Sequence, residues 1–254
     1  MHRSPKFSKQ IPGYSRCALV GSAGVLGGAG WGHVLDDRKS YDAVIRLNNA
    51  PTYGFEEDVG SRTTVRFIHD WHLMQRNRAE LLRTDEGGFA VVWPSLTRPA
   101  GRYGGPSAGE KEKVDEMTAY LTSVSANLTM ARVSDMIFHV GALLGKAHNG
   151  PFPPYVPSSG WYGTLAALSY CGSLDVYGFS WTSAPESLSR RAHSRRPGRL
   201  RNAAYYFKKH AAGELSEPDY YLSRLKKNPD SHHILGKENE SLQAIGKACG
   251  VRFR

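Results

Sequence analysis

Short apolar runs that end at glycine, proline or a polar residue recur along the chain and predict buried strands. The first run, residues 17–20, stops at Gly21. A parallel strand whose two faces are both covered reads as a continuous apolar run rather than an alternating one. By this criterion the predicted strands are residues 17–20, 41–47, 65–68, 89–93 and 174–177.

Other segments carry apolar positions at helical spacing. The run over residues 158–170 opens with serines, which favour the N-terminus of a helix. Near the end of the chain, apolar side chains recur at Leu242, Ile245 and Cys249 and predict an amphipathic helix that begins at Glu238. Further helices are predicted at residues 73–82, 111–121 and 133–144.

Strands that alternate with helices favour a mostly parallel sheet, because parallel neighbours need a crossover connection. We find no internal repeat and no linker that would divide the chain. We therefore expect an α/β protein in which residues 1–16 form an N-terminal arm. Residues 17–254 then form a single Rossmann-like domain, with helices on both sides of a mostly parallel central sheet.

Glycines crowd the segment after the first predicted strand, at positions 21, 24, 27, 28 and 30. A strand that ends in glycines can bring backbone N–H groups close to a phosphate or a ribose. The spacing here is G-x-x-G-x-x-G and not the G-x-G-x-x-G of dinucleotide-binding domains. The glycines alone therefore do not identify a nucleotide.

The composition is that of an ordinary globular protein of 254 residues, 40% hydrophobic and 22% charged. No apolar run approaches the roughly 18 residues of a membrane span, and the first residues lack the apolar core of a signal peptide. The formal net charge of +10 permits nucleic acid, a membrane surface or an anionic substrate as partner. Arginines concentrated between residues 190 and 201 predict a mobile basic loop over about residues 182–202.

The three cysteines, Cys17, Cys171 and Cys249, form no C-x-x-C pair, so their spacing does not predict a zinc site. Their number alone favours free buried thiols, whereas a disulfide would require an oxidising compartment. The acidic residues at 36–37 and 56–58 are interpreted as solvated turns rather than metal ligands, and the chain has no D-x-D motif.

Four separated segments follow one another in a specific order. The first runs from Cys17 to Thr64 and contains R-x-N-x-A-P-T-x-G-F-E-x-D-V-G-S. The others are P-S-S-G-W at 157–161 with V-Y-G-F at 176–179, tyrosine doublets at 205–206 and 220–221, and H-x4-E at 233–238. Together they resemble the large, small, third and very small motifs of the eukaryotic-type sialyltransferases. The first block resembles the galactoside α-2,3 branch in particular.

This resemblance covers residues 16–70 and 157–180 well and the last third of the chain loosely. It implies a variant of the glycosyltransferase A-type fold. The implied reaction is an inverting transfer of sialic acid from CMP-sialic acid to a galactose-terminated glycan of a glycoprotein or glycolipid. It further implies that the reaction needs no metal and no other cofactor, and that nucleic acid is not a partner.

The predicted catalytic residues come from the last two motifs. His233 is the predicted general base, because an imidazole titrates near neutral pH and the resemblance places the base at this position. Glu238 is predicted to support the site from the first turn of its helix, where the dipole favours a carboxylate. The third motif of the family begins with a histidine that assists phosphate departure. Tyr205 and Tyr206, or the doublet at 220–221, stand there instead.

The predicted nucleotide-binding residues lie in the first two motifs. Asn48 offers a donor and an acceptor, which suits ribose hydroxyls or the cytosine edge. Ser22 stands where the family has an asparagine, and His69 where it has a tyrosine that helps to bind phosphate. A helix N-terminus favours phosphate through its N–H groups and its dipole. The expected helix N-terminus contributes Ser158, Ser159 and Gly160.

In the family, a disulfide joins the cysteines of the large and small motifs, and Cys17 and Cys171 occupy these positions. The resemblance therefore implies a Cys17–Cys171 disulfide and leaves Cys249 as a free thiol on a helix. It also implies a Golgi-lumen setting. There the chain would be the catalytic part of a type II membrane protein whose anchor is absent from this sequence.

The residues leave three alternatives open. The same fold could use another CMP-activated acid sugar such as CMP-Kdo, because Ser22, His69 and the third motif depart from the family pattern. A Rossmann-type oxidoreductase would use the glycine turn for NAD(P), with Arg46 near the ribose, but would leave the motifs at 157–160 and 233–238 without a purpose. A basic RNA-binding module depends on net charge alone.

Overall fold

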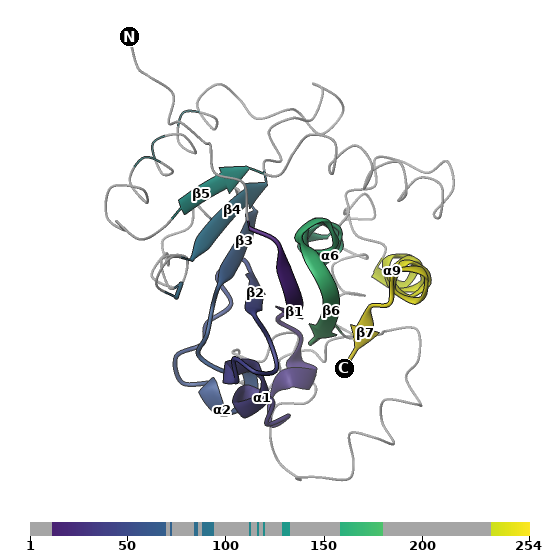
Figure 1. Cartoon of the computed structure of the whole chain (residues 1–254), viewed down its shortest axis with the longest axis horizontal. Coiled ribbons are helices and arrows are strands. Elements are labelled where there is room, and N and C mark those ends of the chain that lie inside the picture. Colours follow the sequence, from purple (N-terminus) through teal and green to yellow (C-terminus); the bar gives the residue numbers. More distant parts are fainter. Residues whose placement is uncertain are drawn as a thin grey trace, which may run out of the picture.

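The computed structural model describes residues 12–69, 72, 84–85, 88–93, 112, 116, 119, 129–132, 158–179 and 235–254. Seven strands of this part form one parallel sheet in the order β5-β4-β3-β2-β1-β6-β7 (Figure 1). The predicted α/β class with a parallel central sheet is thereby confirmed. The strands are β1 (Tyr14–Val20), β2 (Ala43–Leu47), β3 (Val65–His69), β4 (Phe89–Trp93), β5 (Thr129–Arg132), β6 (Cys171–Tyr177) and β7 (Arg252–Phe253).

The five predicted strands are all present, and two of them begin earlier than expected. β1 begins at Tyr14 and β6 at Cys171 because these two segments pair with each other, Tyr14 opposite Cys171 and Arg16 opposite Ser173. Residues 14–16 therefore belong to the sheet and not to the predicted N-terminal arm of residues 1–16. These residues are not apolar enough to read as a strand, so only the pairing identifies them.

Strands β5 and β7 were not predicted. β5 contributes T-M-A-R and pairs with β4, while β7 contributes R-F and pairs with β6. Both segments are short, and neither contains an apolar run. Their hydrogen bonds to a neighbouring strand make them part of the sheet, and a neighbour distant in sequence leaves no local signal.

Some helices of the structure match the predicted ones, and others do not. The described helices are η1 (Gly24–Leu26), α1 (Gly32–Asp36), α2 (Glu56–Val59), α6 (Ser159–Tyr170) and α9 (Leu235–Cys249). α6 and α9 were predicted, and positions 112, 116 and 119 are helical within the predicted helix at 111–121. The short helices η1, α1 and α2 were predicted as turns or loops. The helices predicted at 73–82 and 133–144 and the basic loop at 182–202 lie outside the described residues. None of the described helices has the length and hydrophobicity needed to cross a bilayer.

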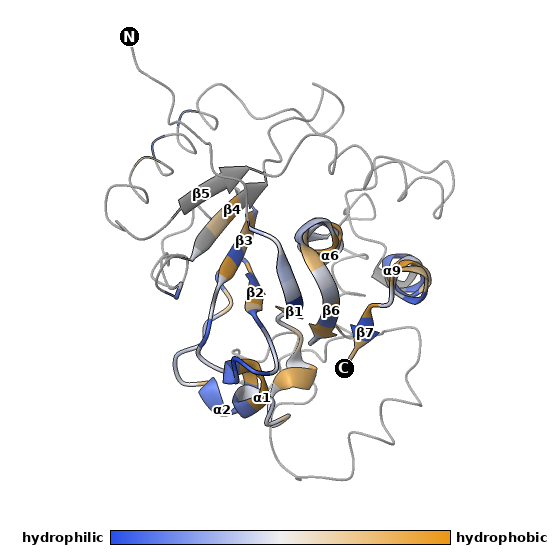
Figure 2. Cartoon of the chain, in the orientation of Figure 1, coloured by the Kyte–Doolittle hydropathy of each residue, from blue (hydrophilic) through white to orange (hydrophobic). Residues whose placement is uncertain are grey.

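Successive side chains of the central strands point into two different hydrophobic cores. In β1, Cys17 and Leu19 pack with α6 and α9, whereas Ala18 and Val20 pack with residues of η1, α1 and α2. Strand β3, with the sequence V-R-F-I-H, carries both orange and blue positions in Figure 2. Burying one large apolar side chain contributes about 1.5–3 kcal/mol, so the two cores fix the helices on opposite faces of the sheet.

A disulfide joins Cys17 of β1 to Cys171 at the start of β6, with the two Cα atoms 6.0 Å apart. This pairing confirms the one that the family resemblance implies, and Cys249 is free and exposed on α9 as expected. The cross-link spans 154 residues of sequence. In the chain-entropy estimate, a loop of that size is worth about 5 kcal/mol of stability.

Candidate functional site

The strand order reverses at β1, which lies between β2 and β6. In open α/β sheets, ligands bind outside the carboxyl ends of the strands at such a switch point. Here Gly21 donates its N–H to the carbonyl of Tyr177 at 2.8 Å, and Ala23 donates to Gly178 at 3.2 Å. Ser22 lies between these two bonds and is half-buried. The structure therefore places this predicted residue at the switch point.

The first turn of α6 carries three predicted residues. Ser158 is the N-cap, and its Oγ accepts a hydrogen bond from the N–H of Trp161 at 3.2 Å. Ser159 and Gly160 follow in the first turn and are half-buried. The N–H groups of such a turn and the positive end of the helix dipole favour an anion such as a phosphate.

Phe179, at the end of the V-Y-G-F motif, was not predicted to have a role. A Cβ atom placed on Gly160 would lie 2.8 Å from Cε1 of Phe179, and one on Gly21 would lie 3.0 Å from its Cδ2. The ring therefore packs against both the turn after β1 and the first turn of α6. This contact explains why the large and small motifs meet at glycines, since a side chain at either position would displace the ring.

Asn48 directly follows β2 and is the one non-glycine residue with a positive φ, +52°, in the part of the chain that the structure describes. Its N–H donates to the carbonyl of Phe67 at 2.8 Å, and its Oδ1 accepts from the N–H of His69 at 2.9 Å. Its carbonyl accepts from Nη1 of Arg66 at 2.8 Å. The structure thus brings the predicted residues Asn48 and His69 into direct contact, and the Arg66 guanidinium stabilises the turn through the carbonyl of Asn48.

Glu238 lies in the first turn of α9, with 1% of its surface exposed. Its Oε1 accepts a hydrogen bond from the N–H of Ser158 at 2.8 Å. The carboxylate therefore contacts the residue that caps α6, and the bond joins two motifs that are 80 residues apart. A backbone N–H bound to a carboxylate makes a charge-assisted hydrogen bond, about twice as strong as a neutral one.

The glycine turn after β1 is closed by a carboxylate of the chain itself. Asp58 of α2 accepts hydrogen bonds from the N–H of Gly28 at 2.8 Å and of Gly30 at 3.1 Å. These two amides are therefore not free to bind a phosphate. The finding argues against the NAD(P) alternative, and it corrects the interpretation of Asp58 as part of a solvated turn.

Arg46 is the second residue that the NAD(P) alternative required, and it is 1% exposed. Its Nη2 donates to the carbonyl of Val59 at 2.6 Å, and its Nε donates to the carbonyl of Arg62 at 2.9 Å. The guanidinium therefore holds the segment after α2 and is not placed to meet a ribose.

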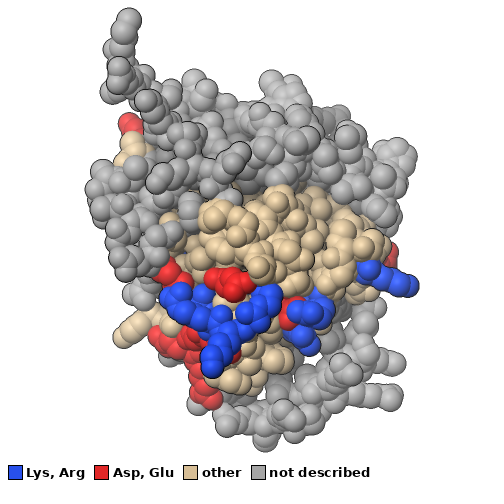
Figure 3. All heavy atoms as spheres, in the orientation of Figure 1, with Lys and Arg blue, Asp and Glu red and all other residues tan. Residues whose placement is uncertain are grey.

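Exposed charges of both signs lie close together on the face shown in Figure 3. Arg16 and Asp42 form an ion pair with 3.7 Å between nitrogen and oxygen. Asp37 is exposed, and the hydroxyl of Ser40, which donates to it, lowers the pKa of its carboxyl group. In Figure 3, acidic side chains border the basic ones, so the described part of that face carries both signs of charge.

The predicted catalytic residues, His233, Tyr205 and Tyr206, lie outside the described residues. The same holds for the doublet at 220–221. Within the described ranges, no group of three or more His, Cys, Asp or Glu side chains is placed to hold a metal ion.

The parallel sheet, the strand reversal and the residues gathered at its carboxyl edge define a Rossmann-like α/β protein of the glycosyltransferase A type. Residues 2–210 match the family model described as Glycosyltransferase family 29 (sialyltransferase). The chain therefore belongs to this glycosyltransferase family.

Known relatives agree with this assignment. The chain is 30% identical over 195 residues to an alpha-N-acetyl-neuraminyl-2,3-beta-galactosyl-1,3-N-acetyl-galactosaminide alpha-2,6-sialyltransferase of Mus musculus, covering 75% of this chain and 52% of that protein. It therefore spans about half the length of that relative. Over 61 residues, 24% of this chain and 16% of the relative, it is 52% identical to a CMP-N-acetylneuraminate-beta-1,4-galactoside alpha-2,3-sialyltransferase of Rattus norvegicus.

Among solved structures, the fold is similar to the crystal structure of a mammalian sialyltransferase. The TM-score is 0.52 at 20% sequence identity, and the match covers 94% of this chain and 68% of the other. At this identity the likeness concerns the fold, which supports the architecture described above.

Proposed function

We propose that this chain transfers sialic acid from CMP-sialic acid to a galactose-terminated glycan. The observation that carries the proposal is the 2.8 Å hydrogen bond between the N–H of Ser158 and Glu238. It connects the turn predicted to bind the donor phosphate with the helix that follows the predicted general base, His233. Family membership supports the reaction class, and Ser22, Asn48 and residues 158–160 all lie at the carboxyl edge of one sheet.

The proposed mechanism assigns each group one task. The first turn of α6 and the phenols of Tyr205 and Tyr206 stabilise the CMP phosphate as it leaves. The acceptor hydroxyl oxygen attacks the anomeric carbon on the face opposite the phosphate, while its proton passes to His233. The bond between that carbon and the phosphate oxygen breaks, CMP departs with the electron pair, and the configuration inverts. Because N–H groups and phenols carry the phosphate charge, the step needs no metal ion.

Two features bear on the acceptor and the compartment. The relatives reported above are named for α-2,6 and α-2,3 transfer to galactosides, so both linkages belong in the assay. The Cys17–Cys171 disulfide supports an oxidising compartment. We propose that this compartment is the Golgi lumen and that the acceptors are glycans of glycoproteins or glycolipids.

Release of CMP from CMP-Neu5Ac in the presence of a panel of β-galactosides tests the proposed reaction. We expect acceptor-dependent CMP release that persists in EDTA, with the product linkage determined by NMR. CMP-Kdo is the matched donor control, and thermal shifts with CMP and with NAD(P) compare the two nucleotide classes. Release from CMP-Kdo alone, or a shift with NAD(P) alone, would contradict the proposal.

His233→Ala is expected to lower the transfer rate by about 10²–10⁴, the usual contribution of a general base. CMP affinity should change little, because the base acts on the acceptor hydroxyl. His232→Ala is the matched control, since it changes the neighbouring histidine without altering the H-x4-E spacing. Retained turnover in His233→Ala would exclude His233 as the base.

A further inference from the structure

A buried carboxylate lies on β6, apart from the site described above. Asp175 is 2% exposed. Its oxygens accept hydrogen bonds from Tyr41 Oη at 2.7 Å, from Arg252 Nε at 2.5 Å and from Arg254 Nη2 at 3.2 Å. A buried carboxylate is stable when it is paired and fully hydrogen-bonded, and here two partners come from the last three residues of the chain. We call Asp175, Arg252 and Arg254 the clasp.

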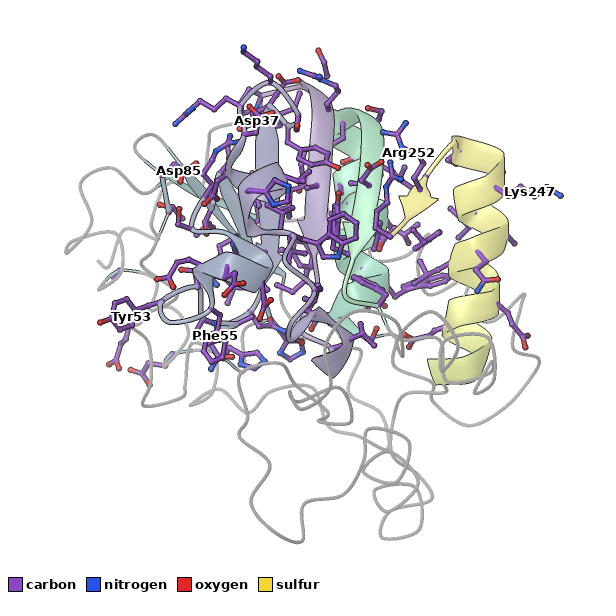
Figure 4. All side chains as sticks on the ribbon, turned by 90° about the horizontal axis from the view of Figure 1, so that it is seen from below. Asp37, Tyr53, Phe55, Asp85, Lys247 and Arg252 are labelled. Carbon is purple, nitrogen blue, oxygen red and sulfur yellow. A yellow bond between two sulfur atoms is a disulfide. The ribbon has the colours of Figure 1, made fainter. Side chains whose placement is uncertain are left out.

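The surroundings of Asp175 keep its partners Tyr41 and Arg252 protonated, so that both can donate hydrogen bonds to it. Burial raises the pKa of Tyr41, and the hydrogen bond that its hydroxyl donates to Asp175 acts in the same direction, so the hydroxyl stays protonated. The hydrogen bond to Asp175 raises the pKa of Arg252. In Figure 4, Arg252 lies beside the ribbons of β6 and β7, whereas Lys247 points away from α9.

The clasp fixes the carboxyl end of α9. Arg252 is opposite Asp175 in the pairing of β6 with β7. The N–H of Val251 donates to the carbonyl of Gly246 at 2.8 Å, which folds β7 back onto the helix. A Cβ atom on Gly246 would lie 2.5 Å from Cε2 of Phe253, so the Phe253 ring packs directly on that turn of α9. The end of α9, β7 and β6 therefore form one connected unit.

The other end of α9 carries Glu238, which binds the N–H of Ser158. The helix has 15 residues and is about 22 Å long at 1.5 Å per residue. It lies at the outer edge of the molecule, beside β7 (Figure 1). A helix of this length transmits the position of one end to the other, because its backbone hydrogen bonds resist bending.

We propose that the clasp is a positioning device for the nucleotide site. By anchoring the end of α9 to the central sheet, it places Glu238 against Ser158 and holds the first turn of α6 in the geometry that receives the donor phosphate. Asp175, Arg252 and Arg254 are thus positioning residues that act through Glu238. The functional part of this inference depends on the proposed CMP-sugar reaction.

The test is a variant with both Arg252→Gln and Arg254→Gln. The arginine side chains are 56% and 44% exposed, so their replacement removes the anchor without opening the core. We expect hydrogen exchange at the Ser158 amide of the ligand-free protein to become about tenfold faster. The Kd for CMP should rise about tenfold. The lysine variant, Arg252→Lys with Arg254→Lys, should recover most of both effects, since it restores the charges.

A double-mutant cycle separates positioning from general loss of stability. Glu238→Met removes the acceptor at similar length, and in that background the clasp substitutions should weaken CMP binding no further. Arg16→Gln, which removes the exposed ion pair with Asp42, is the control and should leave CMP affinity unchanged. Equal losses of affinity in both backgrounds, or unchanged exchange at Ser158, would overturn the clasp. A wild-type protein that binds no CMP would refute the proposed function, and exchange at Ser158 would still decide for or against the clasp.

Discussion

The turns after β1 and β2 both lie at the carboxyl edge of the sheet, where a nucleotide is expected to bind, but they are built differently. The glycine turn after β1 has five glycines between positions 21 and 30, but two of its amides donate to the carboxylate of Asp58. The turn after β2 has no glycine and places Asn48 at a φ of +52°. Its backbone and its Oδ1 are held by Arg66, Phe67 and His69, and none of these bonds uses the side-chain Nδ2.

The difference shows that a flexible backbone and an available donor are separate properties. Glycine permits a close approach, yet a carboxylate from a neighbouring helix fills the space that an anion would take. Asn48 adopts a conformation that costs a non-glycine residue about 1–2 kcal/mol, less for asparagine. In return, the fixed side chain can direct its amide towards a ligand. The less conspicuous turn is therefore the better candidate for binding CMP.

Among variants of the two turns, Asp58→Ala has the largest expected effect. Two backbone N–H groups would lose a charged acceptor, and each partly buried unsatisfied donor costs about 1–3 kcal/mol. We expect the free energy of unfolding to fall by about 2–6 kcal/mol in urea denaturation, with CMP affinity unchanged. Asp58→Asn keeps one acceptor and should lose about half as much stability. If the Asp58→Ala variant had normal stability but failed to bind CMP, the glycine turn and not the turn after β2 would be the nucleotide-binding turn.

Asn48→Asp tests the second turn. An aspartate still accepts the N–H of His69, so the turn should persist and the thermal midpoint should change little. The variant lacks the Nδ2 donor and adds a negative charge beside His69, the predicted phosphate-binding residue. The Kd for CMP should therefore rise by at least about tenfold, or about 1.4 kcal/mol. Asn48→Gly is the companion variant, because it also removes the donor but fits the positive φ. Undiminished CMP affinity in both variants, measured by calorimetry, would remove Asn48 from the site.

The same contrast explains which parts could be predicted from the sequence. The five apolar runs are local signals, and each became a strand. The serines before α6 are also local, and Ser158 does cap that helix. Family resemblance, and not any local pattern, was needed to pair Cys17 with Cys171.

What the sequence does not reveal depends on contacts across the fold. Asp58 meets Gly28 across 30 residues, and Asp175 meets Arg252 across 77. Arg46 and Arg66 interrupt apolar runs and are nevertheless buried, because backbone carbonyls accept from their guanidinium groups. No periodicity reports such bonds, since their partners come from other elements.

Gly30→Ala measures the cost of a positive φ in the glycine turn without any steric clash of the added Cβ atom. Gly30 has a φ of +68°, and a Cβ atom there would meet nothing within 4 Å. The expected loss of stability is therefore the conformational cost alone, about 1 kcal/mol. CMP affinity should stay unchanged, as for Asp58→Ala, and Gly30→Asn should lose less stability than Gly30→Ala. A loss of CMP affinity in Gly30→Ala would show that the glycine turn contacts the nucleotide.

Asp37 provides the smallest effect and a pH test of a carboxylate that differs from Asp58 in being exposed. It accepts hydrogen bonds from the hydroxyl of Ser40 at 2.7 Å and from the N–H of Lys39 at 2.9 Å, and it lies at the outer end of the molecule in Figure 4. The bond from Ser40 is the main reason that its pKa lies below the ordinary value of about 3.9.

A lowered pKa in the folded state means that the stabilisation by Asp37 is complete above the pKa of the unfolded state. It is lost as pH falls through the pKa of the folded state. The thermal midpoints of the wild type and Asp37→Asn should therefore differ by a small, constant amount from pH 7 to about pH 5 and converge below about pH 4. A difference that grows on acidification would mean that the folded state favours the protonated carboxyl group, contrary to the hydrogen bonds that it accepts.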